Sequence, residues 1–391
     1  MFRKKWIIAV CFVSLIFSNL GLSAVKQIRD GNLFSSAWSK FNEIVQNGNR
    51  SSVDVVGARY YMRLYSYIQR VIDKRTIPDP VYPIVKLDNG YLDYVTFGKL
   101  SPEDDVVCQR YADSVSQLEK RLAEINIPLV FVMTPVKSHY YDKQTPRGCL
   151  TEYTNDKADI FLRYLAQKSV PFYDTRDILK NNPDEHYRLF FKGDHHWKPE
   201  YALMAFKRFI NDCSNDFPEL QEMDTSWSDE LSVKSEPFDY WEQFQINKTG
   251  KYYILFENSI SHFIPNFETD ITVELPRKGY KKRGRFENIG VSDYYHYNPS
   301  LKISINHKLK DVKVVLIKDS FGLPWFDFLT LSCHEVHMLD LRGYYQSPIE
   351  YIEKVKPDIV IILYHPGVLY KKFEDFFRFT SESKTINPFF Q

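Results

Sequence analysis

The sequence has almost no net charge. Its 51 Lys and Arg residues are balanced by 50 Asp and Glu residues in a chain of 391, and the two kinds are interspersed. Binding to nucleic acid usually requires basic residues gathered on one face, so the composition gives no indication of a nucleic-acid partner. The chain also lacks internal repeats and low-complexity tracts, and its 44% of hydrophobic residues predicts a packed core.

Cysteine and histidine are scarce, with five and ten residues respectively. No two cysteines are spaced C-x-x-C and no H-E-x-x-H motif occurs, which argues against a zinc ribbon, a redox motif or a zincin-type site. We therefore expect no metal and no cofactor. Four cysteines follow the N-terminal segment: Cys108, Cys149, Cys213 and Cys333. In an exported protein they could form two disulfides in any of three pairings, and in a reducing compartment they would stay free, buried thiols.

The first 24 residues have the features of an export signal. A basic start (RKK at positions 3–5) precedes an apolar run from Trp6 to about Ala24. Such a run approaches the ~20 residues needed to span a bilayer, and Leu22 fits poorly at the −3 position for cleavage after Ala24. We therefore expect an uncleaved signal anchor rather than a cleaved signal peptide. The remainder would be exported, periplasmic or otherwise extracytoplasmic, and anchored to the inner (cytoplasmic) membrane.

After the leader, residues 25–80 are expected to form an N-terminal helical and linker region, with a helix near 55–73. Residues 81–391 show helical patterns that alternate with buried strands. Ser101 and Asp104 form a capping box before a helix, and "PLVFVM" is a continuous apolar run typical of a buried strand. The runs "KVVLIKDSF", "EVHMLDL" and "DIVIILYHP" continue the alternation. The pattern predicts an α/β fold, a doubly wound parallel sheet with helices on both faces.

The stretch from about 217 to 307 interrupts this alternation. It is polar and aromatic, and runs such as "KYYILFENS" and "DITVELP" predict short strands. We interpret it as a β-rich insertion packed over the sheet. Within it, "ELPRKGYKKRGRFE" is a basic loop, for which a solvated surface turn is favoured over a site for an anionic ligand.

A serine follows one of the buried strands. In parallel sheets, ligands bind beyond the carboxyl ends of the strands. Ser320 follows "VVLIK" in a turn that also contains Gly322, a context that suits a serine nucleophile. The backbone N–H groups of Phe321 and Gly322 are candidates for stabilising an oxyanion. On this stretch alone, Ser320 could equally be a helix cap.

The motif "GDHHW" supplies what a serine nucleophile needs, a base and an acid that orients the base. Asp194 and His196 are two residues apart, so in extended chain they share one face and His195 points to the other. We therefore predict His196 as the general base and Asp194 as its orienting acid. Adjacent histidines rarely share one metal ion. The plainer alternative has Asp194 as a helix cap and both histidines as polar surface.

Together, "GDHHW" and "KDSFG" resemble the motifs of the DHHW group of SGNH-hydrolase-like proteins, which is similar to the alginate O-acetyltransferases of bacterial exopolysaccharide systems. The resemblance extends from about Val81 to Tyr370. It implies an SGNH-hydrolase-like fold and a triad of Ser320, His196 and Asp194. It also implies an exported O-acetyltransferase, or an acetylesterase, that acts on polysaccharide hydroxyl groups in exopolysaccharide or cell-envelope glycan modification. A membrane-bound O-acyltransferase would supply the acetyl group.

Five further residues are candidates to bind substrate or the oxyanion. Some relatives use a tyrosine near the last strand, which Tyr364 matches, although packing explains this residue equally well. Lys137 and His139 follow the first core strand, and Arg342 and Tyr344 follow "HMLDL". The rival hypothesis is a non-catalytic glycan-binding assembly protein of the cell envelope. In that case, replacing Ser320 would leave polysaccharide binding intact.

Overall fold

The structure is a computed structural model. It describes residues 76–77, 84–94, 100–142, 144–145, 153–192, 195–229, 232–234, 244–246, 252–254, 261–264, 269–286, 289–291 and 299–379. The leader, the helix predicted near 55–73, Cys149 and Asp194 lie outside these ranges. No helix within them is long and apolar enough to cross a bilayer.

The chain divides into two compact units, Met1–Val85 with Pro237–Glu257 and Lys86–Glu236 with Asn258–Gln391. In the first unit, β1 (Thr76–Ile77) pairs antiparallel with the first two residues of β2 (Ile84–Lys86), and β7 (Phe244–Ile246) pairs antiparallel with β8 (Tyr252–Ile254). The division predicted between residues 80 and 81 stays a prediction.

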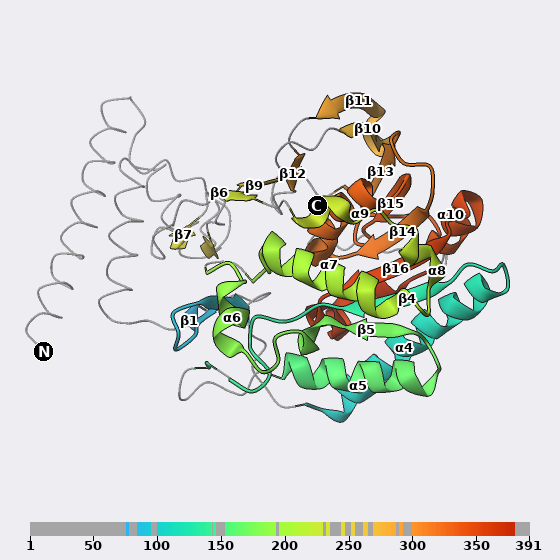
Figure 1. Ribbon diagram of the computed structural model, residues 1–391. Helices are drawn as coiled ribbons and strands as arrows, with labels where there is room; N and C mark the ends of the chain where they lie inside the picture. The colour runs from blue at the N-terminus through green and yellow to red at the C-terminus, as the bar shows by residue number, and fades with distance from the viewer. Residues whose placement is uncertain are drawn as a thin grey trace, which may run out of the picture. The chain divides into compact units, whose positions relative to one another are not determined.

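An eight-stranded sheet forms the centre of the second unit (Figure 1). Its strand order is β11-β10-β13-β15-β14-β16-β4-β5. The five strands from β15 to β5 run parallel, and every residue of β4 and β16 is buried. The predicted α/β fold with a parallel core is therefore confirmed. The parallel strands are β4 (Leu129–Met133), β5 (Phe172–Asp174), β14 (Lys313–Lys318), β15 (Glu335–Leu339) and β16 (Ile359–Tyr364).

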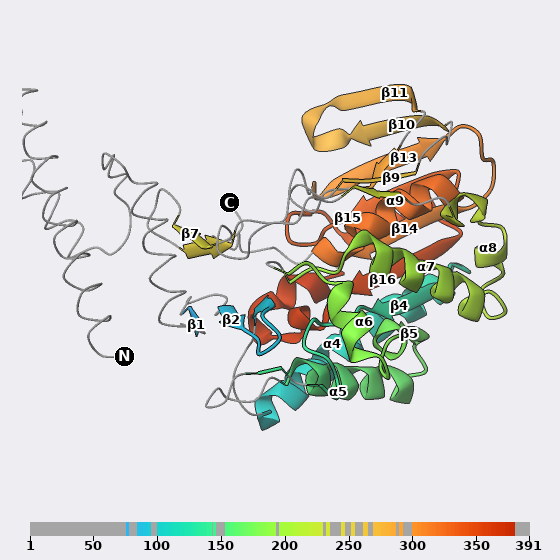
Figure 2. The same cartoon turned by 60° about the vertical axis from the view of Figure 1, so that its left-hand side comes forward.

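Helices cover both faces of this sheet (Figures 1 and 2). Side chains alternate along each strand, so β4 sends Val130 and Val132 into one core and Phe131 and Met133 into the other. α7 and α9 pack on the first core, and α4, α5 and α10 on the second. The α-helices in the described part of this unit are α4 (Pro102–Ala123), α5 (Thr154–Gln167), α6 (Pro183–Arg188), α7 (Pro199–Cys213), α8 (Pro218–Gln221), α9 (Leu323–Ser332) and α10 (Pro348–Val355).

The three longest described strands of the insertion extend the sheet instead of packing over it, which corrects the prediction for that part. β13 (Leu301–Asn306) pairs antiparallel with β15, β10 (Thr269–Leu275) with β13, and β11 (Tyr280–Phe286) with β10, as Figure 2 shows. An exposed edge on β15 would present unpaired N–H and C=O groups, and these strands satisfy them. A separate three-stranded sheet contains β6 (Ser232–Lys234), β9 (Ser261–Ile264) and β12 (Ile289–Val291).

Three of the four cysteines after the leader are described, and all three are free, buried thiols: Cys108, Cys213 and Cys333. Burial raises the pKa of Cys108 to about 12 and that of Cys213 to about 11. Two disulfides among four cysteines would require all three to be paired, so that alternative does not fit the structure.

Candidate functional site

The chain turns sharply where β14 ends. Ser320 opens a single turn of 3-10 helix, η5 (Ser320–Gly322), and Asp319 caps it by accepting the N–H of Phe321 on Oδ1 at 2.9 Å. A Cβ atom on Gly322 would lie only 2.5 Å from Cβ of Lys318, so the turn requires glycine. Ser320 is thus held at the carboxyl end of a central strand.

Backbone contacts hold the described residues on either side of His196. Phe190 and Trp197 form an antiparallel bridge. The N–H of Phe191 donates to the carbonyl of His196 at 3.2 Å, and α7 begins directly afterwards at Pro199. These bonds hold the backbone of His196 in place.

Two hydrogen bonds between described residues join the two motifs. Nε2 of His196 lies 2.7 Å from Oγ of Ser320, and the indole N–H of Trp197 donates to the carbonyl of Phe321 at 3.0 Å. His196 is only 4% exposed and Trp197 is fully buried, so water competes little for either contact. A histidine at this distance from a serine hydroxyl can accept its proton.

The ring of Phe321 lies at the centre of the packing around this pair. Its centroid is 4.8 Å from that of His196 and 4.2 Å from that of His365, whose ring stacks on it at 17°. The ring of His195 is also close, 4.0 Å from His196. The prediction that His195 points to the opposite face is therefore wrong, because residues 195 and 196 lie in a bend rather than in extended chain.

Asp319 is a site residue that the sequence reasoning missed. Its buried carboxylate accepts the N–H of Phe321 at 2.9 Å and the N–H of His365 at 2.6 Å. One side chain therefore joins the ends of β14 and β16. Burial raises the pKa of Asp319 to about 6, although both hydrogen bonds favour the charged form.

His365 is the second missed residue. Its Nδ1 accepts the N–H of Gly367 at 2.9 Å, so the single proton of the neutral ring is on Nε2. Burial, and then the neighbouring His196, lower the pKa of His365 to about 3, and the ring stays neutral near pH 7. The alternation of side chains at the end of β16 could have indicated this residue. Tyr364 points into one core, so His365, the next residue, is expected to point away from it.

The predicted oxyanion donors are already engaged, which corrects that expectation. The N–H of Phe321 bonds to Oδ1 of Asp319, and that of Gly322 to the Asp319 carbonyl at 3.2 Å. The buried hydroxyl of Tyr364 donates to the carbonyl of Phe376 at 2.7 Å. Each of these groups has a single proton to donate, so none is available to an oxyanion in this arrangement.

Arg342 and Tyr344 have structural partners at the end of β15. Arg342 donates to both carboxylate oxygens of Asp340, at 2.9 and 2.6 Å, and Nζ of Lys318 lies 3.0 Å from the same group. Burial alone would raise the pKa of Asp340, but Arg342 and Lys318 hold it well below its usual range. The hydroxyl of Tyr344, which is buried, lies 3.3 Å from the side chain of Gln346. Both predicted residues thus help to pack this sheet edge.

Lys137 and His139 are buried in the loop after β4. Lys137 donates to the carbonyl of Leu92. Nδ1 of His139 accepts the N–H of Asp142 at 3.1 Å, so its proton is on Nε2, which donates to the carbonyl of Leu179 at 3.2 Å. These bonds support the loop, and a role of either residue in substrate binding stays a prediction.

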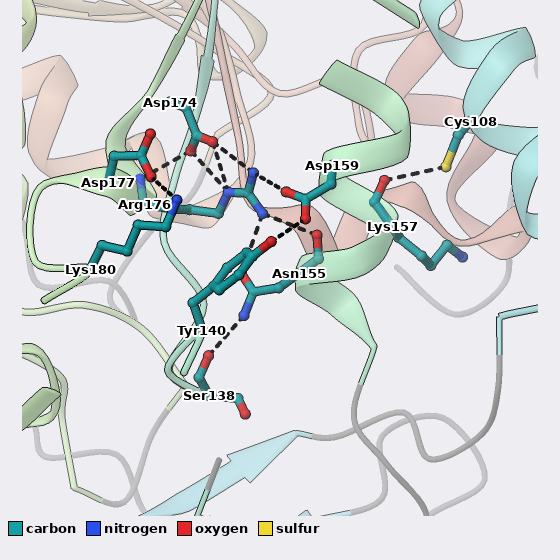
Figure 3. A network of polar contacts seen from close by, with 10 residues as sticks. All are labelled: Cys108, Ser138, Tyr140, Asn155, Lys157, Asp159, Asp174, Arg176, Asp177 and Lys180. Carbon is teal, nitrogen blue, oxygen red and sulfur yellow. Dashed lines mark hydrogen bonds and ion pairs between the residues drawn. The ribbon is translucent and has the colours of Figure 1, made fainter. Parts of the chain in front are cut away.

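An ion-pair network fastens the same loop to α5 (Figure 3). The guanidinium of Arg176 lies 2.6 Å from Asp174 and 2.8 Å from Asp159, and Tyr140 donates its hydroxyl to Asp159 at 2.7 Å. Figure 3 shows Arg176 between the two carboxylates, with Asn155 beside it. A buried guanidinium with several charge-assisted bonds stabilises the fold, and we assign it that role.

His186 gives an expected pH dependence of stability. Its Nε2 donates to the carbonyl of Val136 at 3.0 Å, and burial lowers its pKa from 6.5 to about 3. Between these values the unfolded chain binds a proton that the folded protein does not. The free energy of unfolding therefore decreases as the pH falls from 6.5 towards 3, by up to about 1.4 kcal/mol per pH unit.

His186→Gln, which keeps an N–H donor, should make the free energy of unfolding, measured by urea denaturation, depend less steeply on pH. His307→Gln, at an exposed position, is the control; equal slopes in wild type and His186→Gln would contradict the assignment.

A parallel α/β sheet with a serine at a strand end and a histidine at hydrogen-bonding distance is an arrangement that several classes of serine enzyme share. Residues 98–253 match the family model of the SGNH hydrolase-like domain of the acetyltransferase AlgX, which confirms the predicted resemblance. The matched stretch contains His196 but ends before Ser320, which only the fold adds to the site.

Solved structures share this fold. Bacillus cereus PatB1 has a TM-score of 0.56 and 16% identity, covering 78% of this chain and 99% of that one. PatB1 with a sulfonyl adduct gives 0.57 and 17% over the same shares. A DHHW family protein from Eubacterium siraeum gives 0.50 and 14%, covering 77% of this chain and 96% of that one. At such identities the likeness shows the fold alone. No curated protein sequence matches the chain.

Proposed function

We propose that the protein is an O-acetyltransferase that acetylates hydroxyl groups of a polysaccharide, with Ser320 as nucleophile and His196 as general base. The 2.7 Å contact between His196 and Ser320 carries this proposal. The match to an acetyltransferase domain over residues 98–253 supports the choice of acyl group. Asp194 is proposed to accept a hydrogen bond from the Nδ1–H group of His196, which leaves Nε2 free to act as the base.

In the first half-reaction, Oγ of Ser320 attacks the carbonyl carbon of the acetyl donor while Nε2 of His196 takes the hydroxyl proton. The tetrahedral intermediate then collapses, and the donor oxygen leaves with that proton. In the second half, a sugar hydroxyl gives its proton to His196 as its oxygen attacks the carbonyl carbon of acetyl-Ser320. The tetrahedral intermediate collapses, the bond from that carbon to Oγ breaks, and Oγ takes the proton back from His196 while the sugar keeps the acetyl group. Water in place of the sugar makes the same site an acetylesterase.

The oxyanion needs a donor other than the two amides already bonded to Asp319. We assign this role to the N–H of Ser320 itself, which lies next to the reacting oxygen, as in other serine enzymes.

The same proposal includes an exported location and membrane attachment through residues 1–24. The acetyl group would come from a membrane-bound O-acyltransferase, and the acceptor would be a bacterial polysaccharide. The basic start and apolar run of the leader support this location.

Reaction with a small acetyl ester, with and without added polysaccharide, tests the function. An acetyltransferase should release the alcohol faster when polymer is present and should leave acetyl groups on it. A sulfonyl fluoride should label Ser320, as located by mass spectrometry of the digested protein. Polysaccharide binding without ester turnover and without labelling would support the glycan-binding assembly protein instead.

Gly322→Ala is expected to displace the serine turn, because its Cβ would lie 2.5 Å from Cβ of Lys318. A misplacement of about 1 Å can cost about 10²-fold in rate, so kcat for an acetyl ester should fall by about that factor. Gly343→Ala is the matched control, since its Cβ would approach Ser300 only to 3.2 Å. Steady-state kinetics of the two variants give the comparison; equal kcat values would show that the turn relaxes without moving Ser320.

A further inference from the structure

One strongly basic surface is not used by the proposed catalytic site. The hairpin of β10, the turn Pro276–Lys278 and β11, residues 269–286, contains six basic and two acidic residues, a net charge of +4. Every residue from Pro276 to Arg283 is exposed. We call residues 269–286 the basic hairpin.

Strand direction places the turn of the basic hairpin at the same end of the sheet as Ser320, where β10 and β14 both finish. β15 runs parallel to β14, β13 antiparallel to β15, and β10 antiparallel to β13. β10 and β14 therefore run in the same direction and end at the same edge. Three strand spacings separate them, roughly 15 Å. A hydrogen bond of 2.8 Å from Arg277 to the carbonyl of Gly343, in the turn after β15, agrees with this placement.

Exposed aromatic rings lie beside the cations of this turn. Tyr280 is 44% exposed and Tyr345 is 50% exposed. The guanidinium of Arg277 lies 5.1 Å from the ring centroid of Tyr345. Tyrosine rings provide flat apolar faces with a polar edge, and Arg and Lys bind carboxylates and phosphates. The combination suits a sugar polymer that carries negative charge.

Protection of the sheet edge explains only part of this pattern. Basic residues on an edge strand prevent pairing with other chains, which accounts for cations along β11. Two of them also form ion pairs across the hairpin, Lys281 with Glu274 at 2.8 Å and Arg283 with Asp270 at 2.5 Å. Arg277 and Lys278 belong to the turn rather than to the strand, where no edge needs protection.

We propose that the basic hairpin, together with Tyr345, binds the acceptor chain, and that this acceptor is a polyanionic polysaccharide with carboxylate or phosphate groups. Its role as an acceptor site rests on the proposed function. A bound polymer would extend along the sheet edge from the hairpin towards Ser320. The hairpin would lower the KM for polymer without taking part in the reaction of small esters.

The test uses the full chain with the substitutions Lys278→Glu and Lys282→Glu combined. Lys308→Glu with Lys310→Glu is the matched control, because it makes the same charge change on exposed residues at the opposite sheet edge, after β13. Polygalacturonate serves as the anionic probe, a neutral glucan as its uncharged counterpart, and vesicles with anionic lipid as a membrane probe. At low salt the hairpin variant should bind polygalacturonate about tenfold more weakly than wild type does. Added salt should reduce this difference in affinity, because it screens the charges.

The control variant should bind polygalacturonate like wild type, and small-ester turnover should be unchanged in both. The proposal would be overturned if both variants lost the same affinity for polygalacturonate, or if wild type bound the neutral glucan as tightly as polygalacturonate. Binding of the anionic vesicles but not of polygalacturonate would also overturn it. Failure of the catalytic proposal is seen separately, as the absence of small-ester turnover in wild type. Use of the polymer as an acceptor is then read from its KM, which the hairpin variant should raise by about the same factor.

Discussion

Ser320→Ala is expected to lower kcat for acetyl-ester turnover by about 10⁴–10⁶-fold, the range seen when the nucleophile of a serine enzyme is removed. The substitution removes the atom that forms the acetyl bond and leaves the turn intact, because Asp319 caps it through backbone groups. The free energy of unfolding should change by only about 1 kcal/mol, the value of one hydrogen bond.

The histidines of the motif provide the test of specificity. His196→Asn should reduce kcat nearly as much as Ser320→Ala, and the double variant should be no worse than either, because the two residues act as a unit. His195→Asn is the matched control, a neighbouring histidine whose ring also packs near Phe321. Near-full esterase and transferase activity in Ser320→Ala would end the assignment of the nucleophile.

Asp319→Asn is expected to reduce kcat by about 10²-fold with little change in stability. The carboxylate accepts two backbone N–H groups, from Phe321 and His365. An amide has one oxygen, so one of these N–H groups would meet another donor. The serine turn or the end of β16 would then shift, and rate is sensitive to shifts of about 1 Å.

Two opposing terms keep the expected stability change of Asp319→Asn small. The pKa of Asp319 is about 6 in the folded protein, against 3.8 for a free carboxyl. Its contribution to stability is thus fully present below pH 3.8 and is lost as the pH rises through about 6. At neutral pH the ionised group costs about 3 kcal/mol, which asparagine removes. An unsatisfied buried N–H costs about 1–3 kcal/mol in the other direction.

Asp174→Asn is the matched control for Asp319→Asn. Asp174 also caps a 3-10 turn at the end of a parallel strand, β5, at the far edge of the sheet from the basic hairpin. Its replacement should lower stability through the lost pairing with Arg176 and leave kcat unchanged. Urea denaturation and ester kinetics on both variants separate the two effects. Wild-type kcat in Asp319→Asn would show that the carboxylate does not position the turn.

The sequence predicted the parallel core because its signals are local. Buried strands such as Leu129–Met133 are continuous apolar runs, and the helix after Ser101 starts with a capping box that the structure contains. The edge strands could not be placed in this way. Polar and apolar residues alternate along β10 as expected of a strand. Its pairing with β13, however, depends on which strand has unpaired backbone N–H and C=O groups, and a local sequence pattern does not contain this information.

The site shows the same division between local pattern and tertiary structure. The motifs around His196 and Ser320, 124 positions apart, could be singled out because their residue types suit a base and a nucleophile. The supporting residues Asp319 and His365 could not be singled out from the sequence, because their roles depend on contacts with residues distant in the sequence. Tyr364 bonds to Phe376 inside the core, whereas the following His365 stacks on Phe321.

By itself, the sequence determined the α/β class, the order of the core elements and the two motifs, because periodicity, capping and residue chemistry are properties of short segments. Only the tertiary structure decided that Nε2 of His196 meets Oγ of Ser320, that Asp319 joins two strand ends, and that a basic turn shares their edge. Those facts depend on strand order and direction. Strand order and strand direction depend on which hydrophobic faces are buried against each other and which strands pair. These contacts join residues far apart in the sequence, so a local pattern cannot predict them.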